Sequence, residues 1–261
     1  MEKVIHIVPL GFEIDRAVKP FEAKNGLRPN KIYILSTVEF NDVPVHFVEK
    51  HRSYVKKVKE KLEFLRVEVE IVDTNLRNLL EVIKKTSNII RREKADGNLV
   101  YVNMSACGRL TSIAVTLSGM VHDAKVYYVE ADTYSDNVND MEKHGYSICK
   151  RLSIKYLKNF RIHLPDELQL KVLVEIFTKG KMRTLDIINF LTKEKVIGYP
   201  SNYYRLKRSE KTSIIMKLNR NIIEKLEESG YIVKRRLGRE NEYILTESGE
   251  YITSISGLLE I

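Results

Sequence analysis

Alternation between short apolar runs and longer amphipathic runs restricts the fold of this chain more than any other feature. Five segments have the apolar, β-branched composition of strands: 3–9, 31–37, 67–73, 98–103 and 124–131. Segments with helical spacing separate them, and this order is typical of βα units in a parallel sheet. Strands that are apolar nearly throughout also favour a sheet covered on both faces. The sequence therefore predicts an α/β fold with a Rossmann-like, doubly wound parallel sheet over residues 1–135.

The pattern changes after this region. Residues 136–165 begin as a polar, turn-rich stretch with no clear element, and we interpret them as a linker. Three helical segments follow Pro165, and the third is long and ends near Gly230. A hairpin with Gly238 in its turn and a last helix complete the chain. This order of elements predicts a winged helix-turn-helix domain over 166–261.

Positive charge is concentrated in the second domain. The 261-residue chain has a net charge of +9, and its isoelectric point is about 9.3. Residues 202–239 contain eleven basic and four acidic side chains, so this short stretch carries most of the surplus. A basic surplus of this kind favours polyanions, nucleic acid first. A solvated basic surface that contacts another protein is the alternative, and the residues alone leave both open.

The stretch KLNRNIIEKLEESGYIVKRRLGRENEYILTESG resembles the recognition helix and wing of prokaryotic winged-helix regulators. That resemblance implies contacts with double-stranded DNA from the helix, from the residues before it and from the wing. The residues expected to make these contacts are Tyr204, Arg205, Lys207, Arg208, Lys211, Thr212, Ser213, Lys217, Arg220, Arg235, Arg236 and Arg239.

A strand-to-helix corner in the first domain is the candidate ligand site. The sequence NMSACGR, residues 103–109, follows a predicted strand and opens a helix rich in small residues. Anions settle at helix N-termini because the first backbone N–H groups have no partner within the helix. Asn103, Ser105 and Arg109 add an amide, a hydroxyl and a cation suited to phosphate. The alternative is a capped helix whose small residues only pack on the sheet.

Known cofactor motifs are absent. The sequence has neither G-x-x-x-x-G-K-[ST] nor G-x-G-x-x-G after the first strand, so we expect no P-loop and no nicotinamide cofactor. Cys107 and Cys149 are the only cysteines, and their spacing predicts neither a metal site nor a disulfide framework. We assign no catalytic residue, since no histidine or acidic residue lies next to Cys107 in the sequence to make its thiol a nucleophile.

VNMSACGRL resembles the second motif of the CARF domain, the CRISPR-associated Rossmann fold, although Cys-Gly stands where that motif usually has Gly followed by Thr or Ser. IHIVPLGFEIDR and VYYVEADTY look like segments of archaeal CARF-like proteins joined to winged helices. The resemblance implies a homodimer whose paired corners bind a cyclic oligoadenylate. By motif match or by position in the corner, the expected ligand-binding residues are Leu10, Gly11, Phe12, Asn103, Ser105, Ala106, Cys107, Gly108 and Arg109.

Together these features predict a ligand-responsive transcription regulator that binds DNA and senses a cyclic oligoadenylate or a related nucleotide. A ring nuclease that cleaves this ligand and an adaptor with a vestigial cleft remain alternatives. No histidine follows His163, so the second domain lacks the Arg and His pair of CARF-linked ribonucleases. The N-terminus does not read as a signal peptide and no apolar run approaches a membrane span, so we expect a cytoplasmic protein without a membrane partner.

Overall fold

The computed structural model describes residues 2–22, 26–37, 45–160, 162–238 and 240–259. The chain divides into two compact units, Met1–His163 and Leu164–Glu260. None of the helices in the described ranges combines the length and the apolar composition needed to cross a membrane.

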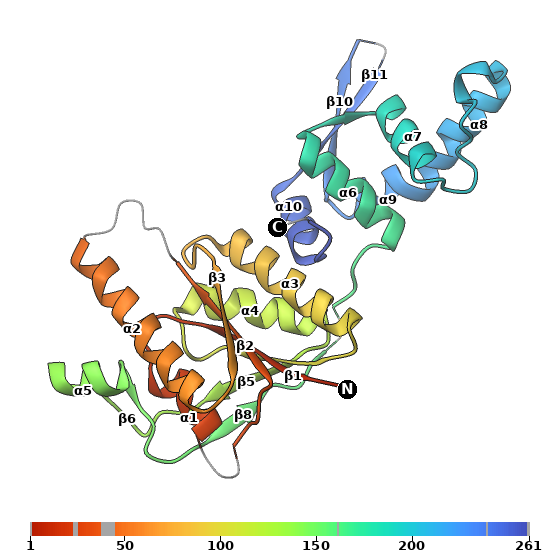
Figure 1. The fold of residues 1–261 in the computed structure, drawn as a ribbon. Helices are drawn as coiled ribbons and strands as arrows, with labels where there is room; N and C mark the ends of the chain where they lie inside the picture. Colours follow the sequence, from red (N-terminus) through yellow and green to blue (C-terminus); the bar gives the residue numbers. More distant parts are fainter. Residues whose placement is uncertain (1, 23–25, 38–44, 161, 239, 260–261) are drawn as a thin grey trace. The chain divides into compact units, whose positions relative to one another are not determined.

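The first unit is built on a six-stranded sheet with the strand order β3-β2-β1-β4-β5-β8 (Figure 1). Its strands are β1 (Val4–Pro9), β2 (Lys31–Ser36), β3 (Glu68–Asp73), β4 (Leu99–Asn103), β5 (Lys125–Val129) and β8 (Ile154–Tyr156). The strands from β3 to β5 pair in parallel, and β8 joins the edge in the antiparallel sense. The chain builds outward from β1 in both directions, which confirms the predicted doubly wound sheet.

Helices cover both faces of the sheet (Figure 1). They are α1 (Asp15–Glu22), α2 (Val45–Phe64), α3 (Leu79–Ala95) and α4 (Arg109–Val121). Val18 of α1 and Val58 of α2 share a buried cluster with Val8 of β1 and Ile34 of β2. On the opposite face, a Cβ at Gly119 would stand 2.5 Å from Cγ2 of Val126, so α4 lies closer to β5 than a larger residue permits. The small residues of α4 therefore pack on the sheet.

Residues 130–163 belong to the first unit, although a linker was predicted over 136–165. They form β6 (Thr133–Tyr134), α5 (Val138–His144), β7 (Ser147–Ile148) and β8. The backbone N–H of Tyr146 donates to the carbonyl of Phe12 at 2.9 Å. Gly145 has φ of +84°, and a Cβ there would stand 2.5 Å from the Phe12 oxygen. This segment is thus held against the loop that follows β1, and its polar composition reflects surface turns.

The second unit has the predicted order of helices and wing. It comprises α6 (Glu167–Lys179), β9 (Met182–Arg183), α7 (Thr184–Lys193), a 3₁₀ turn (Tyr203–Arg205), α8 (Arg208–Leu218), a π-helical turn (Asn219–Ile223), α9 (Glu224–Glu228), β10 (Ile232–Leu237), β11 (Glu240–Leu245) and α10 (Glu247–Ile255). The segment from α8 through α9, residues 208–228, is called the recognition helix below. Strands β10 and β11 form the wing, and β9 pairs with β11.

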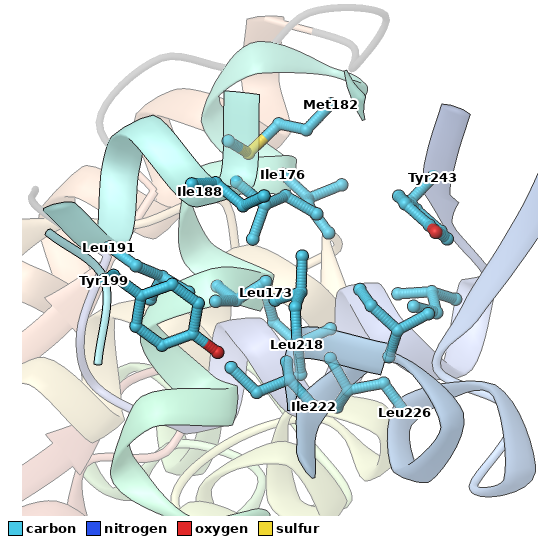
Figure 2. Packing of buried hydrophobic residues seen from close by; sticks show 14 of the residues in the cluster. Leu173, Ile176, Met182, Ile188, Leu191, Tyr199, Leu218, Ile222, Leu226 and Tyr243 are labelled. Carbon is cyan, nitrogen blue, oxygen red and sulfur yellow. The ribbon is translucent and has the colours of Figure 1, made fainter. Parts of the chain in front are cut away.

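Leucine, isoleucine and tyrosine side chains from all parts of the second unit meet in one core (Figure 2). Leu173 of α6, Leu191 of α7, Leu218 of the recognition helix and Tyr243 of the wing are each fully buried. Burial of one such aliphatic side chain is worth about 2 kcal/mol. The recognition helix and the wing are therefore fixed to the same apolar scaffold.

Hydrogen bonds between side chains and the backbone fix the starts of three helices. The Asp166 carboxylate accepts from the Gln169 backbone N–H at 2.9 Å and so caps α6. Helix α3 is capped by Asn78, whereas the nearby Asn75 side chain closes a turn by accepting from the Arg77 N–H. Helix α8 begins at Arg208 after the cap position Lys207, whose N–H donates to the Glu210 carboxylate at 2.8 Å.

Candidate ligand pocket and nucleic-acid interface

The loops after β1 and β4 meet at the carboxyl edge of the sheet, where the strand order reverses. Strands β1 and β4 are parallel neighbours, and the Gly11 N–H donates to the Ala106 carbonyl at 2.8 Å. In doubly wound sheets, ligands bind in the crevice beyond the strand ends at this switch point. The two loops that sequence analysis selected are therefore in contact.

Asn103 and Ser105 lie beneath this crevice. Their exposed fractions are 0% and 3%. The Asn103 oxygen accepts from the Ser105 hydroxyl at 2.6 Å and from the Ser105 N–H at 2.9 Å. The Asn103 amide donates to the Arg16 carbonyl, and the Ser105 hydroxyl accepts from the Val129 N–H. These two side chains shape the loop from inside, while Leu10 and Ala106, also fully buried, support it.

Arg16 is a structural member of the corner that the sequence did not single out. Its guanidinium donates to the Ser105 carbonyl at 3.2 Å and to the Tyr128 hydroxyl at 2.9 Å. It also pairs with the Glu13 carboxylate at 3.6 Å. Partial burial raises the pKa of Glu13, although hydrogen bonds from Ser147 and the charge of Arg16 oppose this shift. In the sequence, Glu13 and Arg16 could have been found as the oppositely charged residues of GFEIDR, residues 11–16, in the segment after β1.

Helix α4 starts without a side-chain cap. Gly108 occupies the N-cap position with φ of −67° and ψ of 162°, and both Gly108 and Arg109 are exposed. Just before it, the Cys107 Sγ contacts the Met104 carbonyl at 3.8 Å. Burial raises the pKa of the Cys107 thiol to about 12, so the thiol stays protonated and is a poor nucleophile. The corner thus offers free backbone donors and one cation rather than a reactive group.

A pocket of about 410 Å³ opens above the corner. It is lined by Gly11, Phe12, Glu13, Thr37, Phe47, His51, Leu76, Arg77, Cys107, Gly108, Thr111 and Tyr146. The edges and faces of four rings surround Phe12, with centroid distances of 5.3 Å to Tyr54, 5.6 Å to His51, 5.9 Å to Tyr146 and 6.3 Å to Phe47. Burial lowers the pKa of His51, which favours its neutral form beside Phe12.

Three pocket residues come from the loops after β2 and β3, which the sequence did not connect with the site. Thr37 follows β2, and Leu76 and Arg77 lie between β3 and α3. The Thr111 hydroxyl of α4 donates to the Leu76 carbonyl at 2.8 Å, which ties this loop to the corner. Arg77 is exposed and brings a second cation to the rim. Of the nine expected ligand residues, Gly11, Phe12, Cys107 and Gly108 line the pocket, and Arg109 lies exposed at the start of α4.

In the second unit, two of the expected groove lysines are bound to the protein itself. The Lys211 ammonium donates to the Tyr204 carbonyl at 3.0 Å. The Lys217 ammonium donates to the Ile197 carbonyl at 3.1 Å and lies 5.5 Å from the Tyr199 ring centroid. Both lysines therefore help to fix the recognition helix to the segment before it.

The other expected DNA contacts lie at or near the surface. Arg205, Lys207, Arg208, Thr212 and Arg220 are exposed. The Tyr204 hydroxyl exchanges hydrogen bonds with the Asn189 amide of α7 at 3.0 and 3.2 Å. Ser213 faces the hollow between α8 and residues 195–201. Arg235 and Arg236 are exposed on β10, whereas Arg239 lies outside the described residues.

Family models match both units. The model described as "HFX_2341_N:-like, N-terminal" covers residues 4–134. The model of the DUF6293 C-terminal winged helix domain covers residues 168–257.

Two archaeal proteins are related over most of the chain. The uncharacterized protein MJ1513 of Methanocaldococcus jannaschii is 25% identical over 228 residues, which span 77% of this chain and 65% of that protein. An uncharacterized protein of Archaeoglobus fulgidus is 24% identical over 234 residues, which span 87% of this chain and 94% of that protein. The chain therefore covers slightly less than two thirds of the Methanocaldococcus relative.

Among solved structures, protein VC1899 from Vibrio cholerae matches with a TM-score of 0.42 and 11% identity, over 98% of this chain and 66% of that one. Can2 from Sulfobacillus thermosulfidooxidans, in complex with cyclic tetra-adenylate, matches with a TM-score of 0.41 and 12% identity, over 95% and 61%. Because the first family model spans half of the chain and the second matches the winged unit, the chain belongs to the HFX_2341_N-like family and carries a DUF6293 winged helix domain.

Proposed function

We propose that this protein is a ligand-responsive DNA-binding transcription regulator, associated with CRISPR defence, whose first unit senses a cyclic oligoadenylate or a related nucleotide. The proposed partners are that nucleotide, double-stranded DNA and a second copy of the chain. The ligand class follows from the resemblance of VNMSACGRL to the CARF motif. Binding would change the DNA affinity of the winged helix, and by linkage DNA would change the ligand affinity equally.

The observation that carries the proposal is the chemistry of the pocket at the switch point. Its body is an aromatic cage around Phe12, which suits a nucleobase. Its edge contains the uncapped start of α4 at Gly108, which suits a phosphate. Arg77 on the rim and Arg109 at the helix start add positive charge on the same side. An anion with an aromatic body is the ligand that these features favour together.

Pairing of two copies has support in the outer surface of α4. Leu110 and Ile113 lie three residues apart on this helix and are 60% and 52% exposed. Residues at this spacing share one helix face, so the apolar pair lies beside the start of α4. Contact between two such faces would bring two pockets together around one symmetric ligand.

The test is a titration of labelled promoter DNA with the full chain, in the presence and absence of a panel of cyclic oligoadenylates. For the wild type, we expect one ligand to shift the DNA dissociation constant about 5- to 150-fold. Arg109→Ala and Arg77→Ala should need much more ligand for the same shift. Arg28→Ala removes an exposed arginine just before β2, at the opposite edge of the sheet, and should respond like the wild type.

Each result separates one reading from the others. If no ligand changes the DNA affinity of the wild type or of any variant, the protein binds DNA without sensing a nucleotide, and the sensor proposal is contradicted. Absence of a promoter footprint would favour an adaptor. Analysis of the recovered nucleotide for linear product distinguishes a sensor from a ring nuclease.

A further inference from the structure

The wing has two faces, and the register between β10 and β11 assigns each of its basic residues to one of them. Directly opposed residues of an antiparallel pair point to the same face of a sheet, and successive residues of a strand alternate between faces. Lys234 stands opposite Tyr243, and Arg236 stands opposite Asn241. Arg235, between them, stands opposite Glu242. Arg235 and Arg236 therefore project to opposite sides of the wing.

The inner face, defined by Ile232, Lys234, Arg236, Asn241 and Tyr243, extends outward from the core. Ile232 and Tyr243 are buried in the cluster that also contains the apolar side chains of the recognition helix. Farther along the hairpin on the same face, Lys234 and Arg236 are exposed. No carboxylate occurs among the residues of this face, and within the described ranges no acidic oxygen lies within ion-pairing distance of either cation. The inner face therefore carries two uncompensated positive charges.

The outer face, defined by Val233, Arg235, Leu237, Glu240 and Glu242, has a mixed composition. Its two carboxylates already pair with residues of the neighbouring segment. The Lys181 ammonium lies 3.1 Å from the Glu242 carboxylate, and the Arg183 guanidinium lies 3.0 Å from that of Glu240. Arg235 thus projects beside acidic groups, and its strand neighbours Val233 and Leu237 are apolar and about half exposed. The two carboxylates offset part of the positive charge on this face, so it attracts a polyanion less than the inner face does.

We propose that Lys234 and Arg236 are the phosphate-binding residues of the wing and that Arg235 is not one of them. The proposal rests on the proposed DNA-binding function and specifies how the wing takes part in it. It adds Lys234 to the predicted interface and removes Arg235, which sequence alone could not separate from its neighbour. The inner cations reach phosphate without bringing a carboxylate with them, so each replaces one counterion on the DNA.

The experiment measures how the dissociation constant of a short mixed-sequence duplex depends on salt, between about 50 and 200 mM. Full-length wild type is compared with Lys234→Gln, Arg235→Gln and Arg236→Gln. Log affinity falls as log salt rises, and each phosphate contact steepens this negative slope by about 0.9. The slope should therefore become shallower by about that amount for Lys234→Gln and for Arg236→Gln. Arg235→Gln, its matched neighbour, should leave the slope unchanged. Arg236→Lys keeps a point charge and should restore it.

The side chains changed in these variants are exposed, and thermal melts of each variant check that the fold is kept. An equal fall in slope for Arg235→Gln and Arg236→Gln would overturn the assignment. So would unchanged slopes for Lys234→Gln and Arg236→Gln while the wild type binds with a steep slope. A wild type that binds no duplex, or binds it without salt dependence, would instead contradict the proposed function and the wing assignment with it.

Discussion

Asn103 and Arg16 form the frame of the corner, and their roles show how buried polar groups set the shape of a binding loop. Asn103 satisfies two donors of Ser105, and Arg16 occupies the Ser105 carbonyl. The residues left at the pocket surface, Gly108 and Phe12, contribute backbone groups and an aromatic ring. The buried polar side chains thus fix the conformation of the loop backbone, and this conformation positions the groups that face the pocket.

At the residue scale, Gly145→Ala tests how the 133–148 segment is fastened to the pocket. Gly145 has φ of +84° and no room for a Cβ beside the Phe12 carbonyl, whereas Gly97 has φ of +79° and open space. Gly97→Ala should lower the free energy of unfolding by about 1–2 kcal/mol, the cost of a left-handed alanine. Gly145→Ala should cost about 1–3 kcal/mol more, because φ of +84° with ψ of −157° is essentially restricted to glycine and because the added Cβ collides. Urea unfolding of both variants gives the comparison, and equal losses would show that the contact is soft.

His6 makes the stability of the first unit depend on pH. It is fully buried, stacked on Tyr101, and burial lowers its pKa from 6.5 to about 3. The unfolded chain therefore binds a proton between about pH 6.5 and 3 that the folded chain does not. Above about pH 6.5, His6 does not lower the free energy of unfolding. As pH falls below this value, the free energy of unfolding decreases by up to about 1.4 kcal/mol per pH unit. Unfolding at a series of pH values should show a shallower dependence for His6→Gln. The raised pKa of Glu13 acts in the opposite sense but is common to both proteins.

At the scale of elements, the sequence predicted the strands of the parallel sheet to within two residues because each is a short apolar run that contains β-branched residues. Helix starts were less predictable. Asn75 and Asn78 both have a capping side chain, and only tertiary packing selects Asn78. The 136–165 segment was missed because its strands β7 and β8 have only two and three residues, too short for an alternating pattern.

Lys217 should act on stability rather than on DNA affinity. Its ammonium binds the Ile197 carbonyl and fills the space beside Gly198, where a Cβ would collide with it. Lys217→Gln should lower the free energy of unfolding by about 1 kcal/mol and leave the salt dependence of DNA binding unchanged. Arg220→Gln, on the exposed surface of the same helix, should show the reverse pattern. Denaturant unfolding and duplex titration of the two variants check this, and a loss of salt dependence in Lys217→Gln would contradict it.

At the scale of the whole molecule, the sequence identified two of the strand ends that build the pocket and missed the others. Thr37, Leu76 and Arg77 follow β2 and β3, and no local pattern distinguishes them from ordinary loop residues. Their place in the site follows from the strand order, which brings the ends of four parallel strands to one edge. The basic winged unit could be predicted because its charge lies within a short stretch of chain.

Each unit should keep its own binding activity as an isolated fragment. Residues 164–261 contain a closed apolar core of their own, and the division between units falls between His163 and Leu164. A fragment of residues 164–261 should unfold cooperatively and bind duplex DNA with salt dependence but without any response to nucleotide. Residues 1–163 should keep nucleotide binding. Circular dichroism melts and titration of each fragment check this, and an unfolded 164–261 fragment would contradict it.

The bare start of α4 has a consequence for how an occupant of the pocket can be detected. Gly108 has no side chain to accept from the first amides of the helix, and the first backbone bond within it runs from Ser112 to Gly108. A bound anion would supply the missing acceptor and so complete the helix. The amide hydrogens of residues 109–111 would then exchange with solvent more slowly, while those in the middle of α4 would keep their rate. Hydrogen–deuterium exchange at these few positions would thus report occupancy in the absence of any DNA.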